Sequence, residues 1–155
     1  MDSNFFALIS RMRYIERWSL MRNSIHENIQ EHSHMVAVIA HALGVIRRDV
    51  FHLPCDPNEC AAVALYHDCS EILTGDLPTG EIQERLHDLV KAADKLSAYM
   101  KCIEERRAGN DEFLSAEKQT RAILAASPLP EVGYFLEHFI PAFELTLDEL
   151  GTIEE

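Results

Sequence analysis

The sequence predicts an all-α domain of roughly five to seven helices. Apolar residues recur at helical spacing in nearly every segment, capping and stop signals bound those segments, and no stretch alternates as a strand would. The chain has 155 residues, of which 47% are hydrophobic and 26% charged, and it has no repeats and no linker-like tract. We therefore expect a single domain over residues 1–155.

Two helices are predicted in the N-terminal third of the chain. The apolar face of the first comprises Phe5, Leu8, Ile9, Met12 and Ile15. Ser3 is its expected cap, and the polar residues 23–31 are expected to form a loop. The apolar face of the second helix comprises Met35, Ile39, Ala42, Leu43, Ile46 and Val50.

The later helices have clear boundary signals. The third begins at Asp56-Pro57, where the aspartate is the expected cap and the proline occupies the first turn, and it is predicted to continue to Thr74-Gly75. The others are predicted at about residues 83–108, 111–127, 132–139 and 147–150, separated by glycine or proline.

The charge limits the classes of partner. A net charge of −12 argues against duplex nucleic acid or an anionic membrane. Residues 1–30 nevertheless have a net charge of +1, so an anionic ligand is expected near the N-terminal arginines. The sequence has neither an apolar stretch of membrane-spanning length nor a secretory signal, so we expect a cytoplasmic protein whose four cysteines are free.

Four side chains that can bind a metal ion are expected at or beside buried helix faces: His32, His67, Asp68 and Asp94. An ionised aspartate on a buried face is costly unless it is paired or bound to a metal. Two histidines and two aspartates form a mixed nitrogen and oxygen ligand set for one divalent cation. Each residue alone also fits a hydrogen-bonded core histidine or a surface aspartate, so the inference depends on the combination.

Two further carboxylates follow the His67-Asp68 pair. Glu71 lies one turn further along the same predicted face, and Asp76 comes just after the predicted helix end. A carboxylate beside a metal-bound water is the arrangement that general acid–base catalysis requires.

Longer runs of sequence carry a resemblance to a known family. The runs NIQEHS (28–33), YHDCSEILTGDLPT (66–79) and KAADKLSAY (91–99) resemble the HD-domain superfamily of metal-dependent phosphohydrolases. The runs FF (5–6), ERWSLMRN (16–23) and FIPAF (139–143) are similar to the bacterial 5'-deoxynucleotidase family of the YfbR type. The resemblance covers nearly the whole chain and implies an HD-domain helical bundle around one metal site.

The resemblance also implies roles for individual residues. His32, His67, Asp68 and Asp94 match the four metal ligands of that family, and Glu71 matches the catalytic residue that acts on the nucleophilic water. The implied cofactor is one divalent cation, whether Co, Mn, Zn, Fe or Mg.

The substrate-binding residues follow from the same resemblance. Arg17 matches the residue that meets the phosphate, and Trp18 matches the one that meets the sugar. Asp76 matches a carboxylate of the sugar and phosphate pocket and is expected to be catalytic as well. Three of the metal ligands are also expected to contact the substrate, namely His32, Asp68 and Asp94.

The implied activity is hydrolysis of deoxyribonucleoside 5'-monophosphates to deoxynucleoside and phosphate, by a homodimer that binds neither a nucleic acid polymer nor a membrane. Elementary chemistry agrees, because Arg17 offers a planar fork to a phosphate. Trp18 offers a flat apolar wall against which a 2'-hydroxyl would lose hydrogen bonds to water.

One segment departs from the family pattern. In the family, further helical sequence separates the Leu-Pro-Thr run from the helix with the last aspartate, whereas here Gly80 is followed directly by Glu81. The chain has either a true deletion or further residues at this point that the sequence does not show. We predict the latter, with Cα atoms of Gly80 and Glu81 well beyond the ~3.8 Å of bonded neighbours.

Two alternatives stay open. A related HD-type phosphodiesterase or hydrolase of other nucleotides would be expected to have extra histidine ligands or a Glu-Asp pair after the doublet, and no Arg17-Trp18 pair. A non-catalytic helical module with a structural metal would have no use for Glu71 beside the ion. Phosphate release from dAMP distinguishes the three.

Overall fold

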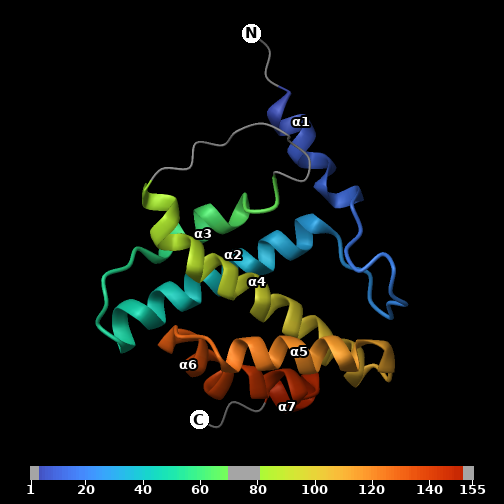
Figure 1. Cartoon of the computed structure of the whole chain (residues 1–155). Helices are drawn as coiled ribbons and strands as arrows, with labels where there is room; N and C mark the ends of the chain where they lie inside the picture. The colour runs from blue at the N-terminus through green and yellow to red at the C-terminus, as the bar shows by residue number, and fades with distance from the viewer. Residues whose placement is uncertain (1–3, 70–80, 152–155) are drawn as a thin grey trace.

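The computed structural model describes residues 4–69 and 81–151, the side chains of residues 81–85 excepted. All the regular elements of these residues are helices, and Glu16 and Asn28 form an isolated antiparallel bridge (Figure 1). The predicted all-α fold is therefore confirmed. Within the same residues, no helix combines the length and the apolar character needed to cross a bilayer.

The N-terminal helix is shorter than predicted. Helix α1 covers Phe5–Ile9 and continues as a 3-10 turn, η1, over Ser10–Tyr14. Asn4 precedes α1 without a side-chain capping bond, and the predicted cap, Ser3, lies outside the described residues. Because α1 has no buried residue, little packing energy holds α-helical geometry beyond Ile9.

Helix α2 covers Ile29–Val45, so the predicted loop over residues 23–31 ends earlier than expected. The side chain of Asn28 accepts a hydrogen bond from the Glu31 amide, and the Glu31 carboxylate accepts one from the Asn28 amide. This capping box was visible in the sequence as Asn-x-x-Glu and fixes the helix start three residues before His32. A π-helical turn, η2 (Ile46–Val50), extends the helix.

Helix α3 covers Pro57–Leu65 and begins as predicted, with the Asp56 carboxylate accepting from two amides of its first turn. The prediction of a helix continuing through residue 72 is wrong at residues 66–68. These residues form a turn in which backbone amides donate hydrogen bonds to carbonyls three residues earlier. One of these bonds runs from the His67 amide to the Ala64 carbonyl. The predicted end at Thr74-Gly75 lies outside the described residues.

The remaining elements follow the predicted order. They are α4 (Glu81–Arg107), η4 (Asp111–Phe113), α5 (Leu114–Ala125), α6 (Pro130–His138), η5 (Ile140–Glu144) and α7 (Leu147–Leu150). Gly80 lies outside the described residues, so the Gly80–Glu81 separation stays a prediction.

The long helix α4 runs through the middle of the molecule, with α2 and α3 on one side and α5 on the other (Figure 1). Its apolar residues Leu89, Leu96 and Ile103 are buried in the main core. Helices α2 and α3 approach closely, because a Cβ at Gly44 would lie 2.8 Å from the Cα of Pro57.

A second face of α4 is polar, and it is buried except at its partly exposed first member, Asp94. Its members recur at helical spacing and comprise Asp94, Ser97, Lys101 and Glu105. We call this set the polar stripe. At its C-terminal end, the Lys101 ammonium donates to the Glu105 carboxylate and to the Ile25 carbonyl. The same carboxylate accepts from the amides of Ser24 and Ile25, so it anchors the N-terminal loop to α4.

These hydrogen bonds determine the ionisation of Glu105. Burial alone would raise the pKa of its carboxyl, but the donors on Lys101, Asn110, Ile25 and Ser24 lower the pKa from 4.5 to about 2. A depressed pKa contributes stability above the unfolded-state pKa, and that contribution is lost as the pH falls from about 4.5 towards 2.

We predict that Glu105→Ala lowers the free energy of unfolding by about 3–5 kcal/mol at pH 7, because it leaves Lys101 buried without its partner. The difference from the wild type should shrink as the pH falls from about 4.5 towards 2. Urea denaturation at several pH values measures both effects. Glu112→Ala is the matched control, since Glu112 pairs with Arg22, whose side chain is 93% exposed, and should cost less than about 1 kcal/mol. Equal losses in the two variants would contradict the assigned anchoring role.

Candidate active site

His32 lies in the first turns of α2 and is fully buried. Its Nδ1 is 3.3 Å from the Ser97 hydroxyl, and its Nε2 is 2.8 Å from Asp94 Oδ1. Both contacts come from the polar stripe of α4, so packing of α2 on α4 determines the orientation of the ring. Sequence reasoning missed Ser97, although its position three residues after Asp94 places both on one helix face.

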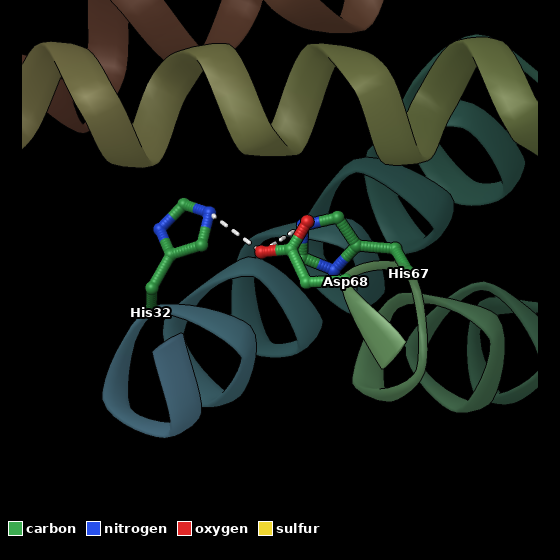
Figure 2. Close-up of side chains that lie close together, drawn as sticks. All are labelled: His32, His67 and Asp68. Carbon is green, nitrogen blue, oxygen red and sulfur yellow. Dashed lines mark ion pairs between the residues drawn. The ribbon is translucent and has the colours of Figure 1, made fainter. Parts of the chain in front are cut away.

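His67 and Asp68 lie in the turn that follows α3. His67 Nδ1 is 2.6 Å from the Ala64 carbonyl oxygen. Because a carbonyl oxygen only accepts, Nδ1 carries the proton and donates a hydrogen bond to it. The lone pair of Nε2 is therefore directed to the other side of the ring, where Asp68 Oδ2 lies 3.3 Å away. Figure 2 shows the Asp68 carboxylate between the rings of His67 and His32.

The three side chains form a group in which the candidate ligand atoms all lie within 4.8 Å of one another. Two of these atoms, His67 Nε2 and Asp68 Oδ2, are buried and have no hydrogen-bond partner among the residues that the structure describes. A buried polar atom without a partner is costly, and a bound cation would satisfy both atoms at once. The donor set of imidazole nitrogen and carboxylate oxygen fits one divalent metal ion.

Asp94 comes from α4 and faces the same group. Its Oδ1 lies 2.8 Å from His32 Nε2 and 4.0 Å from His67 Nε2. Burial raises the pKa of the Asp94 carboxyl, but the hydrogen bond from His32 and the positive charges nearby outweigh it and keep this pKa below its usual value. The carboxyl is therefore an anion at neutral pH, as a metal ligand must be.

Arg17 and Trp18 lie beside this group because the N-terminal loop pairs with the start of α2. The Arg17 amide donates to the Glu27 carbonyl, and the Ile29 amide donates to the Ile15 carbonyl. Arg17 Nη1 lies 3.8 Å from Asp68 Oδ2. Trp18 has a left-handed backbone with φ of 57°, which costs an L-residue of its size about 1–3 kcal/mol.

Glu27 connects these two side chains. Its Oε2 accepts hydrogen bonds from Arg17 Nε at 3.2 Å and from Trp18 Nε1 at 3.1 Å. Sequence reasoning missed Glu27, since an acidic residue in a polar loop gives no periodic signal. Its role follows from the pairing of two chain segments, which the sequence does not reveal.

The structure thus brings together six of the eight site residues named from the sequence. They are Arg17, Trp18, His32, His67, Asp68 and Asp94. The other two, Glu71 and Asp76, lie outside the described residues.

Comparisons with known proteins agree on one family. The sequence model of the YfbR-like 5'-deoxynucleotidases matches residues 4–81 and 80–143. A 5'-deoxynucleotidase of Cronobacter sakazakii is 40% identical over 97% of this chain and 96% of its own length. Those of Shewanella oneidensis and Vibrio cholerae are 40% and 39% identical, over 96% and 97% of this chain and 98% and 99% of their own lengths.

The alignments also locate the departure noted in the sequence. The alignment with the Cronobacter protein extends over 192 positions, more than the 155 residues of this sequence, so the relative has residues that this sequence does not show. The two parts of the family match meet at residues 80 and 81, which places the difference at Gly80–Glu81.

A solved structure shares the fold. The HD-domain phosphohydrolase of Listeria innocua superimposes with a TM-score of 0.73 at 20% identity, over 90% of this chain and 88% of that one. The family match and the relatives of 39–40% identity establish that the chain belongs to the YfbR-like 5'-deoxynucleotidase family.

Proposed function

We propose that this protein is a metal-dependent 5'-deoxynucleotidase, which hydrolyses deoxyribonucleoside 5'-monophosphates to deoxynucleoside and phosphate. The observation that carries the proposal is that His67 Nε2 and Asp68 Oδ2 have no hydrogen-bond partner within the described part of the chain, while the Arg17 guanidinium lies beside them. A cation and an arginine together can hold a phosphate in a protein of charge −12. The named activity of the full-length relatives supports the same reading.

His32, His67, Asp68 and Asp94 would hold the divalent ion. When bound, such an ion polarises a phosphoryl oxygen and lowers the pKa of a water molecule. The Ala64 carbonyl contacts His67 Nδ1 and leaves Nε2 of that ring available, and the Ser97 hydroxyl contacts His32 Nδ1 and orients a ring whose Nε2 faces Asp94.

The remaining residues would bind and orient the substrate. Arg17 presents its terminal nitrogens to the phosphate, and Trp18 forms the wall against the deoxyribose. From the family resemblance, Glu71 would exchange a proton with the attacking water and Asp76 would contact the sugar and phosphate. His32, Asp68 and Asp94 would border the phosphate from the metal side.

The resemblance further supports a homodimer in the cytoplasm. Light scattering on the purified protein measures the oligomeric state, and fractionation of the source cells measures the location. A monomeric mass at micromolar concentration would remove the proposed dimer without affecting the chemistry of the site.

We predict that Mn²⁺ or Co²⁺ raises the melting temperature of the wild type, because ions that bind only the folded state stabilise it. His67→Ala and Asp68→Asn should abolish this shift. His41→Ala, which changes an exposed histidine elsewhere on α2, should retain it. A full shift in the Asp68→Asn protein would show that the ion binds at another site.

We predict that Glu71→Ala lowers kcat by about 10²–10⁴-fold while metal and nucleotide binding stay largely intact, as expected for loss of a general acid or base. Arg17→Ala should chiefly weaken nucleotide binding. Phosphate release from dAMP measures turnover, and calorimetry measures binding. Equal turnover in Glu71→Ala and the wild type would remove the assigned role.

We predict that dAMP is hydrolysed with a higher kcat/KM than AMP, and that 3'-monophosphates are hardly hydrolysed. The reason is the Trp18 wall, at which a 2'-hydroxyl would be desolvated without a partner. A preference for AMP would rule out this function for Trp18. No phosphate release from any nucleoside monophosphate would favour a non-catalytic metal-binding module.

A further inference from the structure

The Glu27 carboxylate connects Arg17 and Trp18 through one oxygen, and its other oxygen, Oε1, lies 3.8 Å from Nδ1 of the candidate metal ligand His32. A single oxygen, Oε2, accepts from both Arg17 Nε and Trp18 Nε1. Hydrogen bonds to an ionised acceptor are roughly twice as strong as those between neutral groups. The side chain of Glu27 is 17% exposed, so water competes only weakly for these bonds.

The contact with Glu27 determines which edge of the Arg17 guanidinium is available. Because Nε is used by Glu27, the terminal nitrogens point to the other side, where Nη1 approaches Asp68 Oδ2 at 3.8 Å. The planar group is therefore held with its free edge towards the metal ligands. A phosphate bound at the metal would meet that edge without any rotation of the side chain.

The same carboxylate limits the motion of Trp18. Its indole packs against Phe113, with ring centroids 5.4 Å apart, and the bond from Nε1 to Glu27 fixes the remaining rotation. The backbone supports this arrangement, because the Glu27 carbonyl accepts from the Arg17 amide and Glu16 pairs with Asn28. These pairings hold the two residues that directly precede the left-handed Trp18.

We propose that Glu27 is a positioning residue, which holds the side chains of Arg17 and Trp18 in a fixed arrangement relative to each other. It thereby determines both the affinity for the phosphate and the discrimination between deoxyribose and ribose. This inference rests on the proposed function, since it assigns the phosphate to Arg17 and the sugar to Trp18.

A different role for Glu27 would act through the metal ligand His32, whose Nδ1 lies 3.8 Å from Glu27 Oε1. The Ser97 hydroxyl is closer to the same nitrogen, at 3.3 Å, and is its hydrogen-bond partner. The two roles differ in their effect on metal binding. A partner of a metal-bound histidine typically changes metal affinity by about 10–100-fold, whereas a residue that orients Arg17 and Trp18 leaves it unchanged.

The test compares Glu27→Ala and Glu27→Gln with the wild type. The glutamine is isosteric with glutamate and keeps one accepting oxygen, so we expect this variant to fold normally. It therefore tests the hydrogen bonds from Arg17 and Trp18 by themselves. Glu16→Ala is the matched control, because Glu16 lies in the same paired segment but its side chain is 52% exposed and faces His26. Trp18 is the only tryptophan of the chain, so intrinsic fluorescence reports on it alone.

We expect Glu27→Ala to lower kcat/KM for dAMP by about ten- to hundredfold, as for loss of charge-assisted hydrogen bonds. The ratio of kcat/KM for dAMP to that for AMP should fall towards one, and Glu27→Gln should give intermediate values. Fluorescence of the variants should shift to the red and be quenched more strongly by acrylamide. Mn²⁺ affinity should stay at the wild-type value, and Glu16→Ala should behave as the wild type throughout.

The remaining outcomes contradict either the positioning role of Glu27 or the proposed function. Wild-type selectivity and emission in Glu27→Ala, or weakened Mn²⁺ binding in Glu27→Gln, would overturn the positioning role while the proposed function stands. If the wild type releases no phosphate from dAMP, the proposed function is wrong. Quenching of Trp18 by added dAMP then tests the inference without turnover, and equal quenching curves for Glu27→Ala and the wild type would overturn it.

Discussion

The fold depends on the need to satisfy the polar stripe of α4. Ser97, Lys101 and Glu105 are buried on one face of α4, so they cannot be hydrated freely, and Asp94 on the same face is 36% exposed. Their partners are His32 and the backbone of residues 24–25. The N-terminal loop and the first turns of α2 must therefore lie along this face of α4, because any other arrangement would leave buried charges unpaired.

The two ends of the polar stripe differ in how many of the polar atoms there have hydrogen-bond partners. At the Glu105 end, the carboxylate has a cation and two backbone amides as partners, which lowers its pKa and makes this end a rigid anchor. At the Asp94 end, His67 Nε2 and Asp68 Oδ2 lie near each other, but neither has a hydrogen-bond partner in the ranges that the structure describes. Unsatisfied groups that persist at one end of an otherwise satisfied network indicate where a ligand supplies the missing interactions.

Sequence reasoning succeeded where the physical signal is periodic or local. Ionisable residues on apolar helix faces, such as His32 and Asp94, stand out because their burial is costly without a partner. It failed at the end of α3, since the apolar spacing continues past Leu65 although the chain turns there. It also missed Glu27, whose bonds to Arg17 and Trp18 arise from pairing of two irregular segments rather than from any spacing.

The position of Asp94 relative to His32 does not depend on how the chain passes from Gly80 to Glu81, where this sequence lacks residues present in its relatives. Helix α4 is held by core residues on both sides of Asp94, including Leu89 and Leu96, and it packs on α2, α3 and α5. The hydrogen bond from His32 to Asp94 then fixes the local register. His67 is held independently, through its bond to Ala64 in the turn after α3. The ligand group is thus assembled by contacts within the described residues.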